Sequence, residues 1–141
     1  HLFFYHPPPP TPASSTSRGL GDVYKRQGIE SRGFLFASAL ALVYGGAVRI
    51  VRKKGKLPNQ RTFSVKYGLE YGNDELEMAY LPEHDLGTCV VVDDVLATGG
   101  TIQAAESLCK MVGLTVLDKL CLMDIGLYDG YDVKSLIQYE K

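Results

Sequence analysis

The sequence lacks a basic excess and a long apolar run. It carries 15 Lys and Arg against 16 Asp and Glu, a formal net charge of -1. A chain without surplus positive charge has no general electrostatic hold on nucleic acid or on an anionic membrane. The most apolar segment, FLFASALALVY at 34–44, is about half of the roughly 20 residues needed to cross a bilayer. We therefore expect a core helix there, and neither nucleic acid nor a membrane as partner.

Cysteine is scarce, and its spacing excludes the common cysteine sites. The three cysteines, Cys89, Cys109 and Cys121, are odd in number and contain no C-x-x-C pair of the kind that redox and zinc sites use. Each lies in an apolar run, which predicts buried free thiols. Free thiols fit a reducing compartment, so we expect a cytoplasmic location.

The first 27 residues differ from the rest. The tract HPPPPTPASSTSRG at 6–19 has no periodicity and too little apolar surface to offset the entropy cost of ordering it. The following LGDVYKRQ at 20–27 resembles translated adapter or assembly-junction sequence. We predict that residues 1–27 are disordered or artefactual, and that one folded domain spans 28–141.

From Gly28 onward, short β-branched runs alternate with helical segments, which is the pattern of an α/β fold. We expect strands at 47–53, 89–93 and 114–125, of which the second is fully buried and the third is long. Near-continuous Val and Leu runs of this kind are typical of buried parallel strands. Residues 101–113 read as the helix between them, with Thr101 as N-cap and Gly113 as the stop signal. This strand-helix-strand unit predicts a right-handed parallel crossover.

The stretch from Gly55 to Leu86 carries Gly, Pro and Asn around two short alternating runs. This pattern predicts a β-hairpin with its turn at YGND, residues 71–74. A long excursion of this kind inside a compact α/β domain is often a lid over a functional site.

The segment VVVDDVLATGGT at 90–101 carries the strongest functional signal. It places Asp93 and Asp94 at the end of a buried strand, where open α/β sheets bind ligands. The next residues enter a helix, whose free amides, dipole and nearby hydroxyls favour phosphate. Because carboxylates repel phosphate, the two acids should meet hydroxyls or a cation instead. A ribose 5-phosphate satisfies both demands.

The segment is neither of the two common phosphate loops. No G-K-[ST] follows, as a Walker loop requires, and the adjacent glycines do not form a G-x-G-x-x-G turn. The whole pattern resembles the phosphoribosyl pyrophosphate (PRPP) signature of type I phosphoribosyltransferases. GIESRGFLFASALA from Gly28, RKKGKLP from Arg52, YGLEYGNDELEM from Tyr67 and the terminal SLIQYE narrow the resemblance to adenine phosphoribosyltransferases. The likeness covers Gly28 to the C-terminus.

The resemblance implies a parallel sheet flanked by helices with a flexible β-hairpin lid. It implies transfer of the phosphoribosyl group from PRPP to adenine, with Mg²⁺ held mainly by substrate oxygens and water and with no metal site built of protein ligands. It also implies a homodimer and an acid or base catalyst, Glu70, in the lid. The substrate-binding residues implied are Arg32, Lys53 and Lys56 for the diphosphate, Asp93 and Asp94 for the ribose hydroxyls, and Ala97, Thr98, Gly99, Gly100 and Thr101 for the 5-phosphate. Tyr71, in the lid, is a further substrate-binding residue that the resemblance implies.

The N-terminus departs from the family pattern. Family members carry several dozen residues before GIESRG, including a hood over adenine and a core strand. Here DVYK at 22–25 offers only Val23 and Tyr24 as strand-forming residues, so we predict that the hood and one core strand are missing. Three alternatives therefore remain open: a xanthine or hypoxanthine transferase, an inactive PRPP-binding fragment, and a non-catalytic PRPP-sensing regulator.

Overall fold

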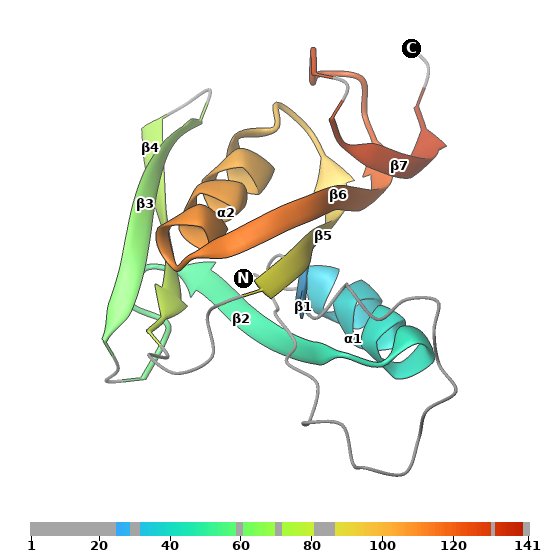
Figure 1. The fold of residues 1–141 in the computed structure, drawn as a ribbon. Coiled ribbons are helices and arrows are strands. Elements are labelled where there is room, and N and C mark those ends of the chain that lie inside the picture. The colour runs from blue at the N-terminus through green and yellow to red at the C-terminus, as the bar shows by residue number, and fades with distance from the viewer. Residues whose placement is uncertain are drawn as a thin grey trace, which may run out of the picture.

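The structure, a computed structural model, describes residues 25–28, 32–58, 61–69, 72–80, 87–130 and 132–139, and of residues 25–28 and 69 the backbone alone. Within these ranges seven strands form one sheet in the order β3-β4-β2-β1-β5-β6-β7 (Figure 1). The strands β2, β1, β5, β6 and β7 are parallel to their neighbours in that series, and the hairpin β3–β4 joins antiparallel to β2. The α/β prediction is confirmed.

The centre of the sheet is built from the valine and leucine runs. Strand β5 (Gly87–Leu96) pairs in parallel with β6 (Leu114–Asp124), and α2 (Gly100–Met111) makes the crossover between them. Cys89, Val91 and Leu108 are fully buried in this core. The predicted strands and helix are present, but β5 extends three residues past Asp93 because Val95 and Leu96 still pair with β6.

The expected gap in the sheet is filled by a short strand. Strand β1 (Lys25–Gly28) lies between β5 and β2 (Ala47–Lys53) and pairs in parallel with both. The prediction that a core strand is missing is therefore wrong. Backbone amides and carbonyls alone make these pairs, so the polar sequence KRQG completes the sheet although it carries no strand-favouring side chain.

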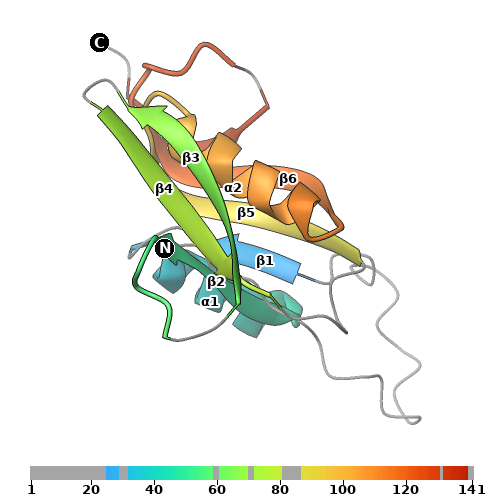
Figure 2. The same cartoon turned by 90° about the vertical axis from the view of Figure 1, so that its left-hand side faces the viewer.

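The two helices cover opposite faces of the sheet, as Figure 2 shows. Helix α1 (Gly33–Tyr44) packs through Ala37 on Val90 and Val92, whereas α2 packs on the face that carries Cys89 and Val91. The bounds of α1 agree with the sequence, but the prediction of a core helix is wrong. The apolar residues of α1 lie on every side of the helix, but only one face packs against the sheet. Large apolar side chains on the other faces are therefore exposed, among them Leu35, Leu42, Val43 and Tyr44.

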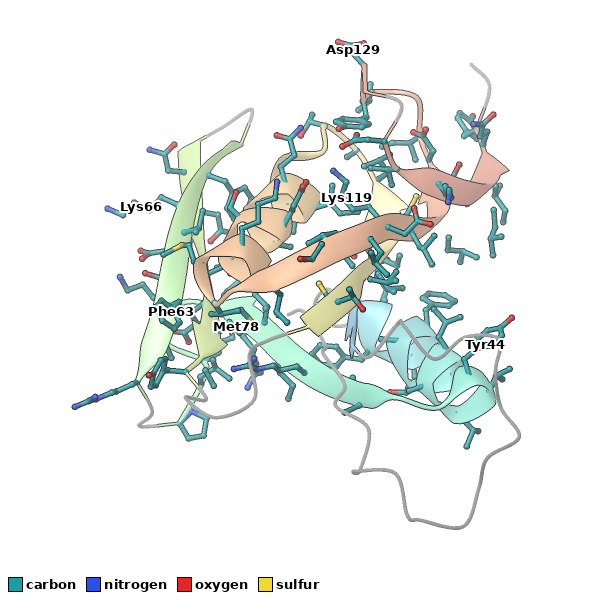
Figure 3. The ribbon with its side chains drawn as sticks, viewed as in Figure 1. Tyr44, Phe63, Lys66, Met78, Lys119 and Asp129 are labelled. Atoms are coloured by element: carbon teal, nitrogen blue, oxygen red, sulfur yellow. The ribbon has the colours of Figure 1, made fainter. Side chains whose placement is uncertain are left out.

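The hairpin extends the sheet at one edge. Strands β3 (Thr62–Leu69) and β4 (Gly72–Ala79) pair in continuous register from Thr62 with Ala79 to Leu69 with Gly72. Leu69 and Gly72 form the last pair of the hairpin, and residues 72–74 already belong to β4, so the predicted turn position at 71–74 is wrong. In Figure 3, Met78 points from β4 into the core and Lys66 points outward. Strand β7 (Lys134–Gln138), which the patterns did not predict, closes the other edge beside β6.

Candidate functional site

The turn from β5 into α2 contains the adjacent glycines. Gly99 has φ +81° and is the residue that precedes the helix, while Thr101 already lies in its first turn. The prediction of Thr101 as N-cap is therefore wrong, because Gly99 adopts the left-handed conformation and its carbonyl accepts from Gln103 N at 3.0 Å. The first amides of α2 have no partner further back in the helix, which makes this turn a candidate anion site.

Asp93 and Asp94 precede this turn. They lie within β5, which ends at Leu96. Successive side chains of a strand point to opposite faces. Val90 and Val92 pack beside α1, so Asp94 continues that set and Asp93 continues the set facing α2. Both are buried, with exposed fractions of 6% and 8%. Both acids lie close to the turn, and their carboxyl groups still reach each other, since a side-chain hydrogen bond to Asp94 contributes to the raised pKa of Asp93.

Burial perturbs the first of the two acids. Loss of solvent raises the pKa of Asp93 to about 8, although the amide of Asp94, which donates to its Oδ1 at 2.8 Å, favours the charged form. The neighbouring carboxyl of Asp94 adds to the upward shift. At neutral pH the Asp93 carboxyl is thus largely protonated, and it can donate a hydrogen bond as well as accept one.

Arg32, at the start of α1, meets the second acid. Its Nε lies 2.5 Å from Oδ2 of Asp94, with the Arg32 side chain 73% exposed and that of Asp94 11% exposed. A guanidinium can pair two oxygens at once and remains charged at all relevant pH values. The ion pair therefore places a fixed positive charge beside Asp94, one of the two acids predicted to bind the ribose hydroxyls.

The basic end of β2 is organised by acids of β4. Lys53 pairs with Asp74 at 2.5 Å, and this hydrogen bond raises the pKa of Lys53. Lys54 pairs with Glu75 at 2.8 Å. Buried Glu77 accepts from the backbone amides of Lys56 and Leu57, both at 3.0 Å. The sequence pattern did not predict these acids, although NDELE, at 73–77, supplies ion-pair partners to Lys53 and Lys54 and an acceptor to the Lys56 amide.

Each glycine of the turn faces a tyrosine. A Cβ added to Gly99 would lie 2.3 Å from Cε2 of Tyr128, and one added to Gly100 would lie 3.3 Å from Cδ2 of Tyr67 and 3.1 Å from the carbonyl of Gly68. Tyr67 also hydrogen-bonds Thr101, and burial raises the Tyr67 pKa. The glycines are therefore needed for close packing against protein groups. Sequence spacing gave no signal for either tyrosine.

An apolar groove of about 430 Å³ lies beside this region. Its lining includes Phe36, Leu40, Val92, Leu120, Leu122 and Leu136. Cys121 also borders it, and burial raises the pKa of this thiol to about 11. All three cysteines are free and buried, as predicted.

Two predicted site residues, Glu70 and Tyr71, lie outside the described residues, as does most of the 1–27 segment. Among the residues that the structure does describe, no group of three or more His, Cys, Asp or Glu side chains could hold a metal ion. No helix in those ranges is long and apolar enough to span a membrane.

Comparison with known proteins bears on this arrangement. A family model described as phosphoribosyl transferase domain matches residues 27–128, which include the turn, both aspartates and all three basic residues. The adenine phosphoribosyltransferase of Hydrogenovibrio crunogenus is 48% identical over 119 residues, which are 80% of this chain and 66% of that protein. The chain belongs to the adenine phosphoribosyltransferase family.

Solved structures of that family share the fold. The adenine phosphoribosyltransferase of Thermoanaerobacter pseudethanolicus matches with a TM-score of 0.69 and 41% identity, over 79% of this chain and 68% of that one. That of Saccharomyces cerevisiae, complexed with an imino-altritol bisphosphate and adenine, matches with a TM-score of 0.65 and 39% identity, over 70% and 55%. The chain spans about two thirds of the length of the Hydrogenovibrio crunogenus relative.

Proposed function

We propose that the chain transfers the 5-phosphoribosyl group of PRPP to adenine, giving AMP and diphosphate, a purine salvage reaction. One observation carries this proposal: β5 leads through Asp94, paired with Arg32, directly into the glycine turn at the start of α2. An acid for sugar hydroxyls, a cation for diphosphate and free amides for the 5-phosphate are thereby brought to one edge of the sheet. The named activity of the relatives supports this assignment.

In this proposal the turn Ala97–Thr101 holds the 5-phosphate. The amides of Thr98, Gly99, Gly100 and Thr101 approach it without side-chain obstruction at the glycines, and the dipole of α2 favours its negative charge. Asp93 and Asp94 serve the ribose hydroxyls. Asp94 accepts hydrogen bonds from them, and the largely protonated Asp93 donates as well as accepts.

In this proposal Arg32, Lys53 and Lys56 bind the diphosphate. Negative charge grows on the diphosphate as its bond to C1 of the ribose breaks, and positioned cations stabilise that charge in the transition state. Arg32 and Lys53 are held by Asp94 and Asp74 in this structure, so binding of diphosphate exchanges one anionic partner for another. The cations are therefore already oriented before substrate arrives.

The reacting ribose carbon passes through an oxocarbenium-like state, comparable in electronic demand to glycoside cleavage. The chain's contribution is to position the two substrates, neutralise the leaving group and exclude water that would hydrolyse PRPP. We assign Glu70 as the acid or base at the adenine imidazole and Tyr71 as a substrate contact. Both fall between Leu69 and Gly72, which pair across the hairpin.

Magnesium fits this site as a substrate-borne ion. Two carboxyl groups lie near the turn, and the described residues offer no cluster of three protein ligands. One or two carboxyl groups suit a Mg²⁺ ion that is held mainly by substrate oxygens and water. Asp93 and Asp94 would be the nearest protein oxygens. When bound, Mg²⁺ neutralises diphosphate oxygens and helps to fix the ribose.

We further propose that the chain acts in the cytoplasm as a homodimer. Its three cysteines are all free, which suits a reducing compartment. Exposed apolar side chains on α1, among them Leu42 at 88% and Val43 at 73%, supply a surface that association would remove from water. Light scattering coupled to size-exclusion chromatography measures the oligomeric state directly.

A second candidate function is PRPP binding without turnover. The exposed face of α1 and the apolar groove beside it are the observations that favour it, since they leave apolar surface uncovered next to the candidate site. One assay separates the two candidates: AMP formation from adenine, PRPP and Mg²⁺, with hypoxanthine and xanthine as competing bases. AMP from adenine alone supports the transferase, and PRPP binding without product from any base supports the second candidate. Product from hypoxanthine or xanthine instead would contradict adenine specificity.

A further inference from the structure

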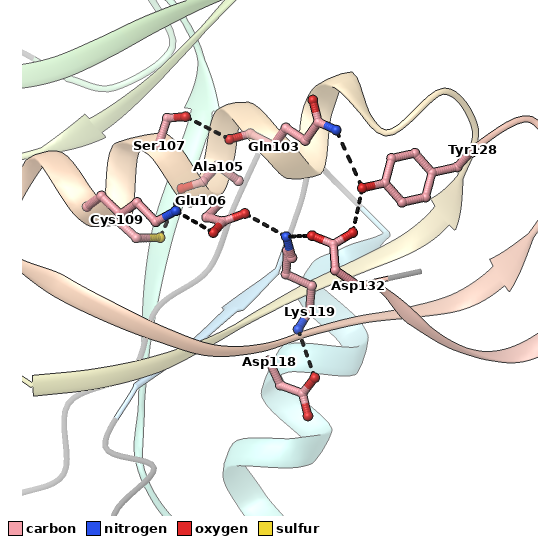
Figure 4. A network of polar contacts seen from close by, with 10 residues as sticks. Gln103, Ala105, Glu106, Ser107, Cys109, Asp118, Lys119, Tyr128 and Asp132 are labelled. Atoms are coloured by element: carbon pink, nitrogen blue, oxygen red, sulfur yellow. Dashed lines mark hydrogen bonds and ion pairs between the residues drawn. The ribbon is translucent and has the colours of Figure 1, made fainter. Parts of the chain in front are cut away.

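A buried lysine ties three segments together beside the candidate site. Lys119 of β6 is 7% exposed, and its Nζ lies 2.6 Å from Oε2 of Glu106 on α2 and also pairs with Asp132 in the segment before β7 (Figure 4). Burial alone would lower the pKa of Lys119, but hydrogen bonds to Asp132 and Glu106 raise it. Lys119 therefore stays charged and holds both acids.

The same network reaches the glycine turn through Tyr128. The Tyr128 hydroxyl donates to Oδ1 of Asp132 at 2.5 Å and accepts from the side-chain amide of Gln103, in the first turn of α2, at 3.5 Å. Its ring packs between two glycines, since a Cβ added to Gly99 or to Gly130 would lie 2.3 Å or 2.4 Å from ring atoms. Contacts on the ring and on the hydroxyl thus fix Tyr128 against the turn.

We propose that Tyr128 is a positioning residue for sugar-phosphate binding, and that Lys119 and Asp132 hold it in place. This inference rests on the proposed function, because it takes the turn 97–101 as the seat of the 5-phosphate. Tyr128 keeps Gly99 in the left-handed conformation that directs the following amides toward a single point. Without the ring, Gly99 regains access to other conformations, and the turn must be ordered again each time phosphate binds.

Lys119 supports Tyr128 through its ion pair with Asp132, in which Lys119 is buried and the Asp132 side chain is 55% exposed. Without Lys119, Asp132 loses the partner that holds its carboxyl near the Tyr128 hydroxyl, and its charge turns toward water. The Tyr128 hydroxyl would then lose its acceptor. The effect of Lys119 on phosphate binding should therefore act through Tyr128 and should largely vanish when Tyr128 is absent.

The test compares two ligands by calorimetry on the full chain. Ribose 5-phosphate probes the turn, and inorganic diphosphate probes the basic residues at Arg32 and Lys53. The variants are Tyr128→Ala, Tyr128→Phe, Lys119→Met and the double variant Tyr128→Ala/Lys119→Met. Lys134→Met is the matched control, because Lys134 also pairs with an aspartate, Asp118, but is exposed, and its ion pair is separate from those that Lys119 makes with Glu106 and Asp132.

We expect Tyr128→Ala to weaken ribose 5-phosphate binding about tenfold and Tyr128→Phe, which keeps the ring, about threefold or less. Lys119→Met should fall between them, and the double variant should match Tyr128→Ala. Diphosphate affinity should stay within about twofold throughout, which a general loss of folding would not permit. Lys134→Met should bind both ligands like the unmodified chain.

Equal ribose 5-phosphate affinity in Tyr128→Ala and the unmodified chain would overturn the inference while leaving the proposed function intact. Failure of the unmodified chain to bind ribose 5-phosphate or PRPP would overturn both. If Lys119→Met does not fold, as far-ultraviolet circular dichroism would reveal, the two Tyr128 variants decide the matter. Parallel weakening of both ligands in those variants would also contradict a role specific to the turn.

Discussion

Arg32 and Asp94 form an ion pair in which the guanidinium Nε lies 2.5 Å from the carboxylate Oδ2. The pair joins the start of α1 to the last residues of β5. It connects the residue proposed for diphosphate with one proposed for the ribose. In the proposed function, the diphosphate and the ribose of PRPP would therefore meet residues that are already in contact with each other.

The first prediction concerns this pair. Arg32→Met should weaken PRPP binding about tenfold or more, because a charge-assisted contact to diphosphate is lost, and should leave ribose 5-phosphate binding within about twofold. Calorimetry with both ligands measures the split. Arg61→Met, a change of an exposed arginine outside the site, is the control, and equal losses for both ligands would contradict the assignment.

Asp93 should make stability depend on pH. Its pKa is about 8 in the folded chain and near 3.8 when unfolded, so the folded state retains a proton across that window. Stability therefore falls as pH rises from about 4 to about 8, by at most about 1.36 kcal/mol per pH unit. Asp93→Asn removes this dependence.

Thermal unfolding at pH about 5 and about 8 tests the sign. The gain in melting temperature of Asp93→Asn over the unmodified chain should be larger at the higher pH. Asp129→Asn, a change of an exposed aspartate, should show no such difference. A gain that shrinks as pH rises would show that Asp93 is not the buried, proton-retaining group described above.

Gly99 and Gly55 allow a matched comparison of packing. They have φ values of +81° and +83°, but a Cβ at Gly55 meets nothing within 4 Å whereas one at Gly99 meets Tyr128 at 2.3 Å. Gly55→Ala should cost about 1 kcal/mol of stability from backbone conformation, and Gly99→Ala should cost more because the ring must move. Denaturant unfolding gives both values. Adding Tyr128→Ala should reduce the cost of Gly99→Ala alone, and equal costs at the two glycines would refute the packing.

Glu77 should order the basic turn that follows β2. It is 5% exposed and accepts from the amides of Lys56 and Leu57. Glu77→Ala leaves two amides without their acceptor, so we expect a loss of about 1–3 kcal/mol in stability and weaker diphosphate binding. Glu77→Gln keeps one carbonyl oxygen and should lose less. Denaturant unfolding and calorimetry check this order, which a greater loss in the glutamine variant would reverse.

Glu70→Gln tests the proposed catalyst in a chain shown to form AMP. Turnover should fall by about a hundredfold or more, the range typical of a lost acid or base, while PRPP affinity stays nearly unchanged. Steady-state kinetics and calorimetry provide the two numbers. Unaltered turnover would remove Glu70 from the chemical step, and Glu75→Gln in the neighbouring strand serves as a control for charge alone.

The central strands and α2 were predictable because their apolar runs and glycine stops act locally. The KRQG strand was not, since its pairing depends on backbone groups supplied by β2 and β5. The exposed face of α1 was also missed, because an all-apolar helix gives no indication of which side meets the sheet. Periodicity describes neighbours in sequence and says nothing of distant partners.

The same distinction between local patterns and distant contacts applies to the candidate site. The segment 90–101 showed both aspartates and the glycine turn, because they are contiguous. Three other contacts of the site join residues that are 13 or more positions apart in the sequence. They are Arg32 with Asp94, Tyr128 with Gly99, and Lys119 with Asp132. Such contacts arise from strand order and register, which a single sequence does not fix.

The most direct measurement is nuclear magnetic resonance of the backbone amides of the full chain during titration with ribose 5-phosphate. The account predicts that the largest shifts fall on Thr98 to Thr101, with smaller changes at Asp94. Shifts centred elsewhere, or no saturable shift at millimolar ligand, would contradict binding of a sugar phosphate at the turn between β5 and α2.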